Sequence, residues 1–461
     1  MTTVDNPTWT DERSLRSWIA LLAERGEFGE VCSKIEPDET IGAVLERADG
    51  RCAVLFGDVA GARFPVVGNV VSGREHLALA MGCDVDELAD RYADALERPV
   101  PWQELPAEDA PVLRNRLSGD RVLSTMPLAV QHEHDAGKYF TSALLCVRDP
   151  RSGMINLSIN RMLAVGEREL RVLLLPGRLR QIFTEAEEQG RDLDVAIAVG
   201  VDPLLVLASQ APADRDLDDV AVAGALHGRA VPVVQAPTID ALVPANAEFL
   251  IEGRIRAGVR EPEGPFGEFP RTYGAGGPAP VIDVVDVWHR DTPVFQTILS
   301  GGREHFLAGG IPREAALLRG LRRAGFDVAQ VRFPEGGSCR FHAVISIRGA
   351  APGVATNVLL ASFAVNPVVK HAVVVDDDVD VFDDEQVAWA VATRVQADRD
   401  VLIVPNSKGS PLDPSSDRGL GAKMGIDATV PAAERERYAR MRPPAPGDEL
   451  LQRYLREAGL S

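Results

Sequence analysis

The pattern of apolar and polar residues changes twice along the chain and divides it into three regions. In the first region, residues 14–25 carry apolar side chains at helical spacing, and residues 75–97 repeat that spacing with one interruption. Short apolar runs at 52–56 and 64–71 have the length and composition of buried strands. Because helices and strands are interleaved, we predict an α/β domain at residues 1–115.

In the second region, the pattern changes to short runs that are typical of strands. The clearest run is Asn-Leu-Ser-Ile-Asn at 156–160, in which polar and apolar residues alternate as in a strand with one polar face. Residues 143–148 predict a further strand, and 281–287 and 293–299 predict two strands that close this β-rich region. We place the central domain at residues 116–311.

The last third returns to mixed helices and strands. A helix is predicted from Pro312 to Ala324, where Pro stands at a first helical position and apolar residues recur at helical spacing. Further strands are predicted at 341–347, 370–378 and 402–405, and further helices at 357–364, 386–394 and 448–458. These elements predict a second α/β domain at residues 312–461, whose final helix is suited to contact another subunit.

Composition and charge narrow the function classes. The 461-residue chain has a net charge of −19, which argues against nucleic acid or an anionic membrane as a main partner but leaves a small anionic substrate open. No apolar run approaches the roughly 20 residues that span a bilayer. The start of the chain lacks the basic and apolar segments of a signal peptide. Five cysteines without a Cys-x-x-Cys pair favour reduced thiols, so we expect a cytoplasmic protein without a zinc site.

The strongest candidate chemistry lies in the run Glu-Gly-Pro-Phe-Gly-Glu, from Glu263 to Glu268. Pro and Gly exclude a helix here, and a Gly-Pro-Phe-Gly turn can bring both carboxylates to one side. Two carboxylates held close together have pKa values that move apart, so that one stays ionised while the other carries a proton. The pair therefore indicates general acid/base chemistry, although a charged surface loop also explains the spacing.

Three other groups are candidates for chemistry. Arg161 follows the alternating strand at 156–160, and the end of that strand or a bulge would have to direct it to the polar face. His132 and His134 share a strand face, as some metal sites require, but an exposed loop explains them better because no further His follows until His227. Three consecutive Asp at 376–378 are interpreted as a solvated run at a strand end.

Several of these motifs together resemble one enzyme family. The run Glu-Gly-Pro-Phe-Gly-Glu followed by an aromatic residue, and Asn156 to Arg161 as Asn-x-x-Ile-x-Arg, are similar to signatures of the UbiD-type decarboxylases (3-octaprenyl-4-hydroxybenzoate carboxy-lyase-like). Further blocks from about Asp135 to Thr429 follow in the family's order. The resemblance implies a mixed α/β fold in three domains: an N-terminal α/β domain, a central split β-barrel that binds flavin, and a C-terminal α/β dimerisation domain.

The resemblance also implies roles for individual residues. Arg161, Glu263 and Glu268 match the family's catalytic set, in which Arg161 orients the substrate carboxylate, Glu268 donates a proton, and Glu263 pairs with Arg161. A guanidinium suits this role because it binds carboxylates in a bidentate way. The positions that match the cofactor site are Asn156, Ser158, Ile159, Asn160, Arg161, Arg178 and Lys370.

The metal site departs from the family's pattern. Asn156 matches one metal ligand, and Asp219 stands where the family has a Glu that reaches about one methylene further. The third ligand of the family is a His, and here Leu179 occupies its position and cannot bind a metal. A divalent metal, Mn²⁺ by resemblance, and K⁺ are therefore left open, with two alternatives: water replaces the missing ligand, or the metal is absent.

The implied activity is the reversible, non-oxidative decarboxylation of an aromatic, heteroaromatic or α,β-unsaturated carboxylic acid with prenylated FMN. A flavin prenyltransferase would supply the cofactor, and a homodimer or a hexamer of three dimers is expected. Two alternatives remain at this point. The same site can run in reverse as a carboxylase, or the departures at Leu179 and Asp219 mark a non-catalytic subunit that has lost its cofactor.

Overall fold

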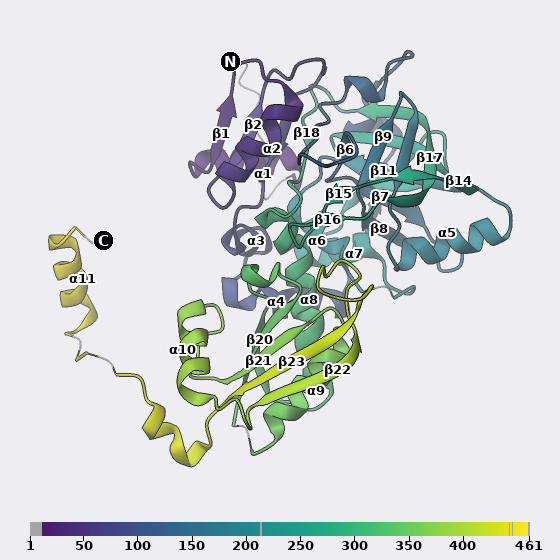
Figure 1. The fold of residues 1–461 in the computed structure, drawn as a ribbon. Helices are drawn as coiled ribbons and strands as arrows, with labels where there is room; N and C mark the ends of the chain where they lie inside the picture. The colour runs from purple at the N-terminus through teal and green to yellow at the C-terminus, as the bar shows by residue number, and fades with distance from the viewer. Residues whose placement is uncertain (1–11, 213, 350, 442, 445, 460–461) are drawn as a thin grey trace.

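The computed structural model describes residues 12–212, 214–349, 351–441, 443–444 and 446–459. The first residues, from which the absence of a signal peptide was inferred, lie outside these ranges. Figure 1 shows a β-rich middle between an N-terminal α/β part and a C-terminal α/β part, so the predicted mixed α/β fold is confirmed. No described helix is long and apolar enough to cross a membrane.

The N-terminal part is built on a four-stranded sheet of order β1-β2-β3-β18. Helix α1 packs on it because Leu15, Trp18 and Leu22 form one buried stripe, and Ser14 caps its first turn. The elements are α1 (Leu15–Glu24), β1 (Phe28–Val31), α2 (Pro37–Ala48), β2 (Ala53–Phe56), β3 (Val66–Gly68), α3 (Arg74–Met81), α4 (Leu88–Glu97) and β18 (Phe295–Gln296). Gly82, with φ 66°, ends α3 and explains the interruption seen in the sequence.

One strand of this sheet corrects the sequence analysis. The strand predicted at 293–299 was expected to close the β-rich domain, but β18 pairs in parallel with β3, with Phe295 opposite Val66. Strand pairing between segments more than 200 residues apart depends on the tertiary fold, and a local apolar run does not specify its partner.

The central part is a nine-stranded antiparallel sheet of order β6-β9-β10-β17-β14-β11-β7-β8, with β5 on β17. Its strands are β5 (Asn115–Arg116), β6 (Tyr139–Phe140), β7 (Leu144–Arg148), β8 (Ile155–Ile159), β9 (Met162–Val165), β10 (Glu169–Val172), β11 (Leu193–Val199), β14 (Phe249–Glu263) and β17 (Gly277–His289). Smaller pieces around it are β4 (Gln103–Glu104), β12 (Pro232–Gln235), β13 (Leu242–Pro244), the hairpin of β15 (Phe266–Gly267) and β16 (Tyr273–Gly274), α5 (Arg178–Glu188), α6 (Pro203–Ala208) and α7 (Asp219–His227).

The C-terminal part is a five-stranded sheet of order β19-β20-β21-β23-β22. Helix α9 covers it, and Val358, Leu359 and Phe363 of that helix are buried in the core. The elements are β19 (Val328–Arg332), β20 (His342–Ile347), α9 (Val354–Val365), β21 (His371–Asp376), α10 (Asp384–Arg394), β22 (Val401–Lys408) and β23 (Leu420–Ala428). Helix α11 (Asp448–Glu457) lies apart from the body, and none of its residues is buried (Figure 1).

Helix α8 (Arg303–Arg323) joins the parts and begins nine residues before the predicted start at Pro312. Pro312 therefore lies inside the helix, and the boundary expected between residues 311 and 312 falls within it. A Pro inside a helix leaves one carbonyl without its intrahelical donor. Twelve buried residues along α8 show that tertiary packing outweighs this local cost.

Candidate active site

The turn between Glu263 and Glu268 connects the end of β14 to the β15–β16 hairpin. Glu263 is the last residue of β14, and the Gly264–Pro265 peptide bond that follows is cis. Gly264 has φ 82°, and a Cβ on it would come within 2.8 Å of the Gly276 backbone, so only Gly fits this crossing of two chain segments. The turn brings both carboxylates to one side, where they meet Arg161.

Arg161 lies in the two-residue link between β8 and β9, because β8 ends at Ile159 and frees the side chain from strand alternation. Its Nε and Nη2 donate to the two carboxylate oxygens of Glu263, at 3.0 and 2.9 Å, and its Nη1 donates to Glu268. The side chains of Arg161, Glu263 and Glu268 are 8%, 2% and 12% exposed, respectively. The structure thus assembles the three predicted residues into one shielded cluster.

The two carboxylates of the cluster are not equivalent. Burial raises the pKa of Glu268, and the negative charge of Glu263 raises it further, while Arg161 acts in the opposite direction. Glu263 receives a bidentate pair from the guanidinium, whereas Glu268 shares only one nitrogen. The arrangement can therefore hold a proton on Glu268, as a general acid requires.

A second cluster forms around Asp219, the first residue of α7. Its Oδ2 accepts hydrogen bonds from the Asn156 side chain at 2.9 Å and the Leu157 backbone at 2.7 Å, and its Oδ1 accepts from Arg178. Asp219 and the Arg178 side chain are 1% and 3% exposed. Burial raises the pKa of Asp219 to about 6, against the opposing effect of Arg178, so it remains mainly ionised at neutral pH. The carboxylate of Asp219 thus joins two other predicted site residues, Asn156 and Arg178.

This donor set does not fit a divalent metal. Leu179 is buried in the hydrophobic core and offers no donor atom. Both oxygens of Asp219 are already engaged by N–H donors, which leaves only Asn156 Oδ1 as a buried oxygen without a partner. Among the described residues there is no group of three or more His, Cys, Asp and Glu that could hold a metal ion. We therefore assign no metal to Asn156 and Asp219.

The same region does fit the phosphate of a flavin. Arg178 Nε is buried without a hydrogen-bond partner, and Arg178 opens α5, whose N-cap Gly177 provides no side-chain cap. Free N–H groups at a helix N-terminus and a guanidinium both favour an anion. Along β8, Ser158 donates to Asn160 at 2.7 Å, and Asn160 donates to the Leu173 carbonyl at 2.9 Å, which fixes the polar face of the strand.

The remaining candidates have other contacts. Lys370 lies just before β21 and forms an ion pair with Asp413 at 2.9 Å. His134 is exposed and stacks near Tyr273, consistent with the loop interpretation. The interpretation of residues 376–378 as a solvated run needs correction, because Asp376 is 1% exposed and pairs with Arg394.

Comparison with known proteins identifies the family. The N-terminal, Rift-related and C-terminal domains of 3-octaprenyl-4-hydroxybenzoate carboxy-lyase (UbiD) match residues 19–96, 103–303 and 306–428. The anhydromevalonate phosphate decarboxylase of Methanothermobacter thermautotrophicus is 37% identical over 400 residues, which are 87% of this chain and 93% of that protein. The chain belongs to the UbiD family.

Solved structures of UbiD-class enzymes share the fold. HmfF from Pelotomaculum thermopropionicum in complex with FMN matches with a TM-score of 0.91 at 45% identity, over 94% of this chain and 97% of HmfF. An evolved dimeric form of HmfF in complex with prFMN matches with a TM-score of 0.88 at 42% identity, over 96% and 100% of the two chains. The apo 3,4-dihydroxybenzoic acid decarboxylase of Enterobacter cloacae gives 0.89 at 28%, over 96% and 99%.

A cationic cluster in this UbiD protein was missed by the sequence analysis. The guanidinium groups of Arg313 and Arg340 both lie against Gly309, where a methyl group would overlap them. Arg313 donates to the Gly309 carbonyl at 2.5 Å and Arg340 to the Phe306 carbonyl at 3.1 Å, and no carboxylate of the described residues lies within 4.0 Å of either group. Arg340 also stacks over Phe269, the residue after Glu268, at 5.3 Å. The cluster is therefore close to the catalytic turn.

Burial makes this cluster a site of uncompensated positive charge. It lowers the pKa of Arg313 to about 10 and that of Arg340 well below its usual range, and the positive charge of Arg313 also lowers the pKa of Arg340. Burial also lowers the pKa of neighbouring His305 to about 3, so His305 is neutral at pH 7. Arg340 is buried and Arg313 is half-buried, and two shielded guanidiniums without a carboxylate favour an anion. The sequence carried little signal, since Arg313 and Arg340 are 27 positions apart.

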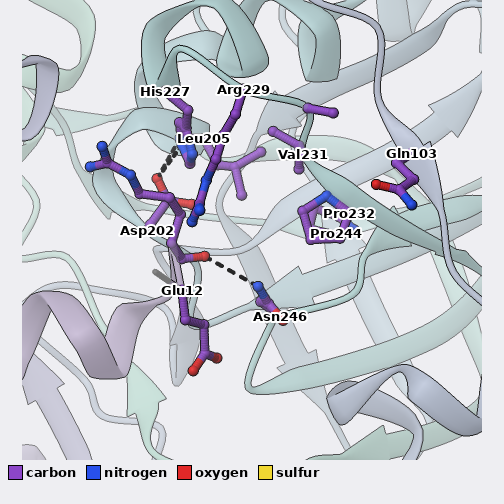
Figure 2. A pocket seen from close by; sticks show the side chains of 12 residues that line it. Glu12, Gln103, Asp202, Leu205, His227, Arg229, Val231, Pro232, Pro244 and Asn246 are labelled. Carbon is purple, nitrogen blue, oxygen red and sulfur yellow. Dashed lines mark hydrogen bonds and ion pairs between the residues drawn. The ribbon is translucent and has the colours of Figure 1, made fainter. Parts of the chain in front are cut away.

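A separate cavity of about 360 Å³ lies at the other end of α7 (Figure 2). Asp202 and His227 contribute to its wall, and a hydrogen bond of 2.9 Å joins Asp202 Oδ1 to His227 Nε2. Asp202 also caps α6 by accepting from the backbone of Leu204 and Leu205. Because its best-placed carboxylate is committed to a helix cap, and none of the predicted site residues lines it, we give this cavity no role in catalysis.

Proposed function

We propose that the protein is a prenylated-FMN-dependent decarboxylase that acts on an aromatic, heteroaromatic or α,β-unsaturated carboxylic acid. The observation that carries the proposal is the contact of Arg161 with both Glu263 and Glu268 in a UbiD-family chain. Three buried, mutually paired charges are costly to maintain, and a non-catalytic subunit has no need of them.

Each residue of the Arg161, Glu263 and Glu268 cluster has a separate role. Glu263 fixes the guanidinium of Arg161 through two hydrogen bonds and keeps it oriented. When Glu268 is protonated, its hold on Nη1 weakens, and the substrate carboxylate can take that position. Decarboxylation replaces CO₂ by one proton, and Glu268 is the group placed to deliver it.

The cofactor fits the residues near the second cluster. Asn156, Arg178 and the polar face of β8 with Ser158, Ile159 and Asn160 would hold it, and Lys370 would reach its phosphate from the C-terminal part. When bound, prenylated FMN supplies the electron sink for the carbon that loses CO₂. A flavin prenyltransferase would provide this cofactor.

The cationic cluster narrows the proposed substrate. Arg340 stacks over Phe269, the residue after Glu268, and Arg313 lies next to Arg340 at Gly309. A second carboxylate or a phosphate on the substrate would neutralise them, whereas a monoacid would leave both cations uncompensated. The name of the Methanothermobacter relative specifies a phosphate-bearing substrate, which is consistent with such a group. We therefore propose a substrate that carries a second anionic group.

The test is a turnover assay with the loaded enzyme. The chain is co-expressed with a flavin prenyltransferase, and CO₂ release is measured with a panel of matched unsaturated acids, each with and without a second carboxylate or phosphate. We expect turnover of doubly anionic members and little of the others. Flavin-loaded, folded protein that releases no CO₂ from any member, and exchanges no solvent deuterium into their decarboxylated products, would contradict the proposal.

Two finer points belong to the same proposal. The same three residues can also serve carboxylation, so the direction of the reaction depends on the concentration of CO₂. Incubating the enzyme with the decarboxylated product under raised CO₂, and measuring the acid formed, tests the reverse reaction. A homodimer or hexamer is proposed because α11 exposes Leu450 and Tyr454, at 39% and 50%, on a helix that has no buried residue. Light scattering of the full chain and of a Leu450→Glu variant measures that state. We also propose a cytoplasmic location, as the sequence analysis expects.

A further inference from the structure

At the site where the family's metal ligands are incomplete, the Arg178–Asp219 pair places a guanidinium. We infer that this protein binds its flavin without a divalent metal, and that Arg178, fixed by Asp219, supplies the positive charge at the cofactor phosphate. The inference rests on the proposed function, since it concerns the cofactor of the same site.

Arg178 is held in one place by several acceptors. Its Nη2 donates to Asp219, and its Nη1 donates to the carbonyl of Leu217 and, at 2.8 Å, to that of Asp214. Only Nε remains buried without a partner. Arg178 thus behaves as a built-in cation with one hydrogen-bond donor still available.

Asp219 cannot easily serve a metal in addition. Its carboxylate accepts from three donors, namely Arg178, the Asn156 side chain and the Leu157 backbone. A metal that took these oxygens would strand buried N–H groups, which is costly, and it would lie beside a guanidinium of like charge. Mg²⁺ and similar cations want about six oxygens in a regular octahedron, and Asn156 Oδ1 is one.

The position of Arg178 in α5 directs its charge toward an anion. It is the first residue of an 11-residue helix, and side chains tilt toward the helix N-terminus, so its guanidinium and the free N–H groups lie at the same end. Gly177 offers no side-chain cap, so those N–H groups have no side-chain acceptor there. The helix terminus and the buried Nε provide two independent features that favour a phosphate.

The decisive experiment measures metal and flavin in the same sample. The chain co-expressed with a flavin prenyltransferase is dialysed against EDTA, separated from free flavin, and analysed by absorption and by inductively coupled plasma mass spectrometry. We expect about one flavin per chain, fewer than about 0.1 divalent ions per flavin, and no flavin loss on chelation. One divalent ion per flavin, with flavin released when the ion is removed, would overturn the inference.

A pair of variants on α5 provides the matched control. Arg178→Met removes the cation, whereas Arg180→Met removes an exposed arginine two positions further along the helix. We expect the affinity for FMN, measured by fluorescence titration, to fall about 100-fold or more in Arg178→Met and to be unchanged in Arg180→Met. If Arg178→Met does not fold, Arg178→Lys keeps the charge but loses the planar guanidinium with its several N–H donors. This variant is expected to bind FMN weakly and still without metal.

Failure of this inference and failure of the proposed function give different results. Folded wild-type protein that takes up no flavin, with or without added Mn²⁺, contradicts the proposed function. Flavin uptake that requires Mn²⁺, with Arg178→Met binding as well as the wild type, contradicts only the assignment of Arg178.

Discussion

Arg161 gives two of its three nitrogens to Glu263, through hydrogen bonds of 3.0 and 2.9 Å from Nε and Nη2. This leaves Glu268 as the exchangeable partner of the guanidinium, bound through Nη1 alone. The asymmetry separates two carboxylates that come from one six-residue turn. One of them holds the arginine, and the other can move its proton.

Replacing Glu268 by Gln should therefore abolish turnover while leaving the flavin bound. The amide has the same shape and still accepts from Arg161, but it has no carboxyl proton to deliver, so we expect kcat to fall by about 10³-fold or more. The decrease is measured by CO₂ release, with flavin content followed by absorption. Glu261→Gln, two positions before Glu263 on β14, is the control and should keep wild-type kcat. A fully active Glu268→Gln enzyme would falsify the assignment.

The pH dependence of kcat should report the raised pKa of Glu268. Because the protonated form is the proton donor, activity falls as the pH rises through that pKa, which burial and Glu263 place above the usual range of a Glu. Glu263→Gln removes a negative charge, lowers the pKa of Glu268, and should move the alkaline limb to lower pH. An alkaline limb that is unchanged in Glu263→Gln, in whatever activity remains, would assign it to another group.

Arg340→Met should change substrate selectivity more than it changes catalysis. The Met side chain keeps the packing against Phe269 but loses the charge, so we expect KM for a doubly anionic acid to rise about 10- to 100-fold. The kcat/KM of a matched monoacid should change little. Arg319→Met, on the same helix as Arg313 and paired with Glu97 at the surface, is the control. Equal loss for both acids would show that Arg340 is only structural.

Glu304 should make the stability of the fold fall with rising pH. It is 4% exposed, accepts from the Val70 backbone at 3.1 Å, and burial raises its pKa to about 8. Since the unfolded chain releases this proton near pH 4.3, the stabilising contribution is complete below that pH and is lost as the pH approaches 8 and passes it. Tm should fall by several degrees more between pH 6 and 9 in the wild type than in Glu304→Gln. Glu24→Gln, exposed on α1, should follow the wild type.

Features coded by short stretches of sequence were predicted well. The interrupted helix at 75–97 appears as α3 and α4, separated at Gly82, because a left-handed glycine ends a helix wherever it occurs. The turn between Glu263 and Glu268 was predicted because Pro and Gly restrict the backbone locally. The sequence left open on which face of the strand the side chain of Arg161 lies. In the structure β8 ends two residues before Arg161, so strand alternation does not fix the direction of that side chain.

Features that depend on distant segments were missed. The pairing of β18 with β3 and the contact of Arg178 with Asp219 join residues far apart in sequence, and no local pattern records them. The early start of α8 was missed because Pro312 favours a first helical position, whereas contacts along the whole helix outweigh that preference.

Helix α8 also has a mechanical consequence. Over its 21 residues, a length of about 31 Å, it carries Glu304, anchored to the end of the N-terminal sheet, and Arg313 of the cationic cluster. Because a helix transmits displacement along its axis, the proposed site for a second anion is positioned in part by a hydrogen bond to Val70 two and a half turns away. Selectivity in this enzyme can therefore evolve through substitutions in the N-terminal sheet that never touch the substrate.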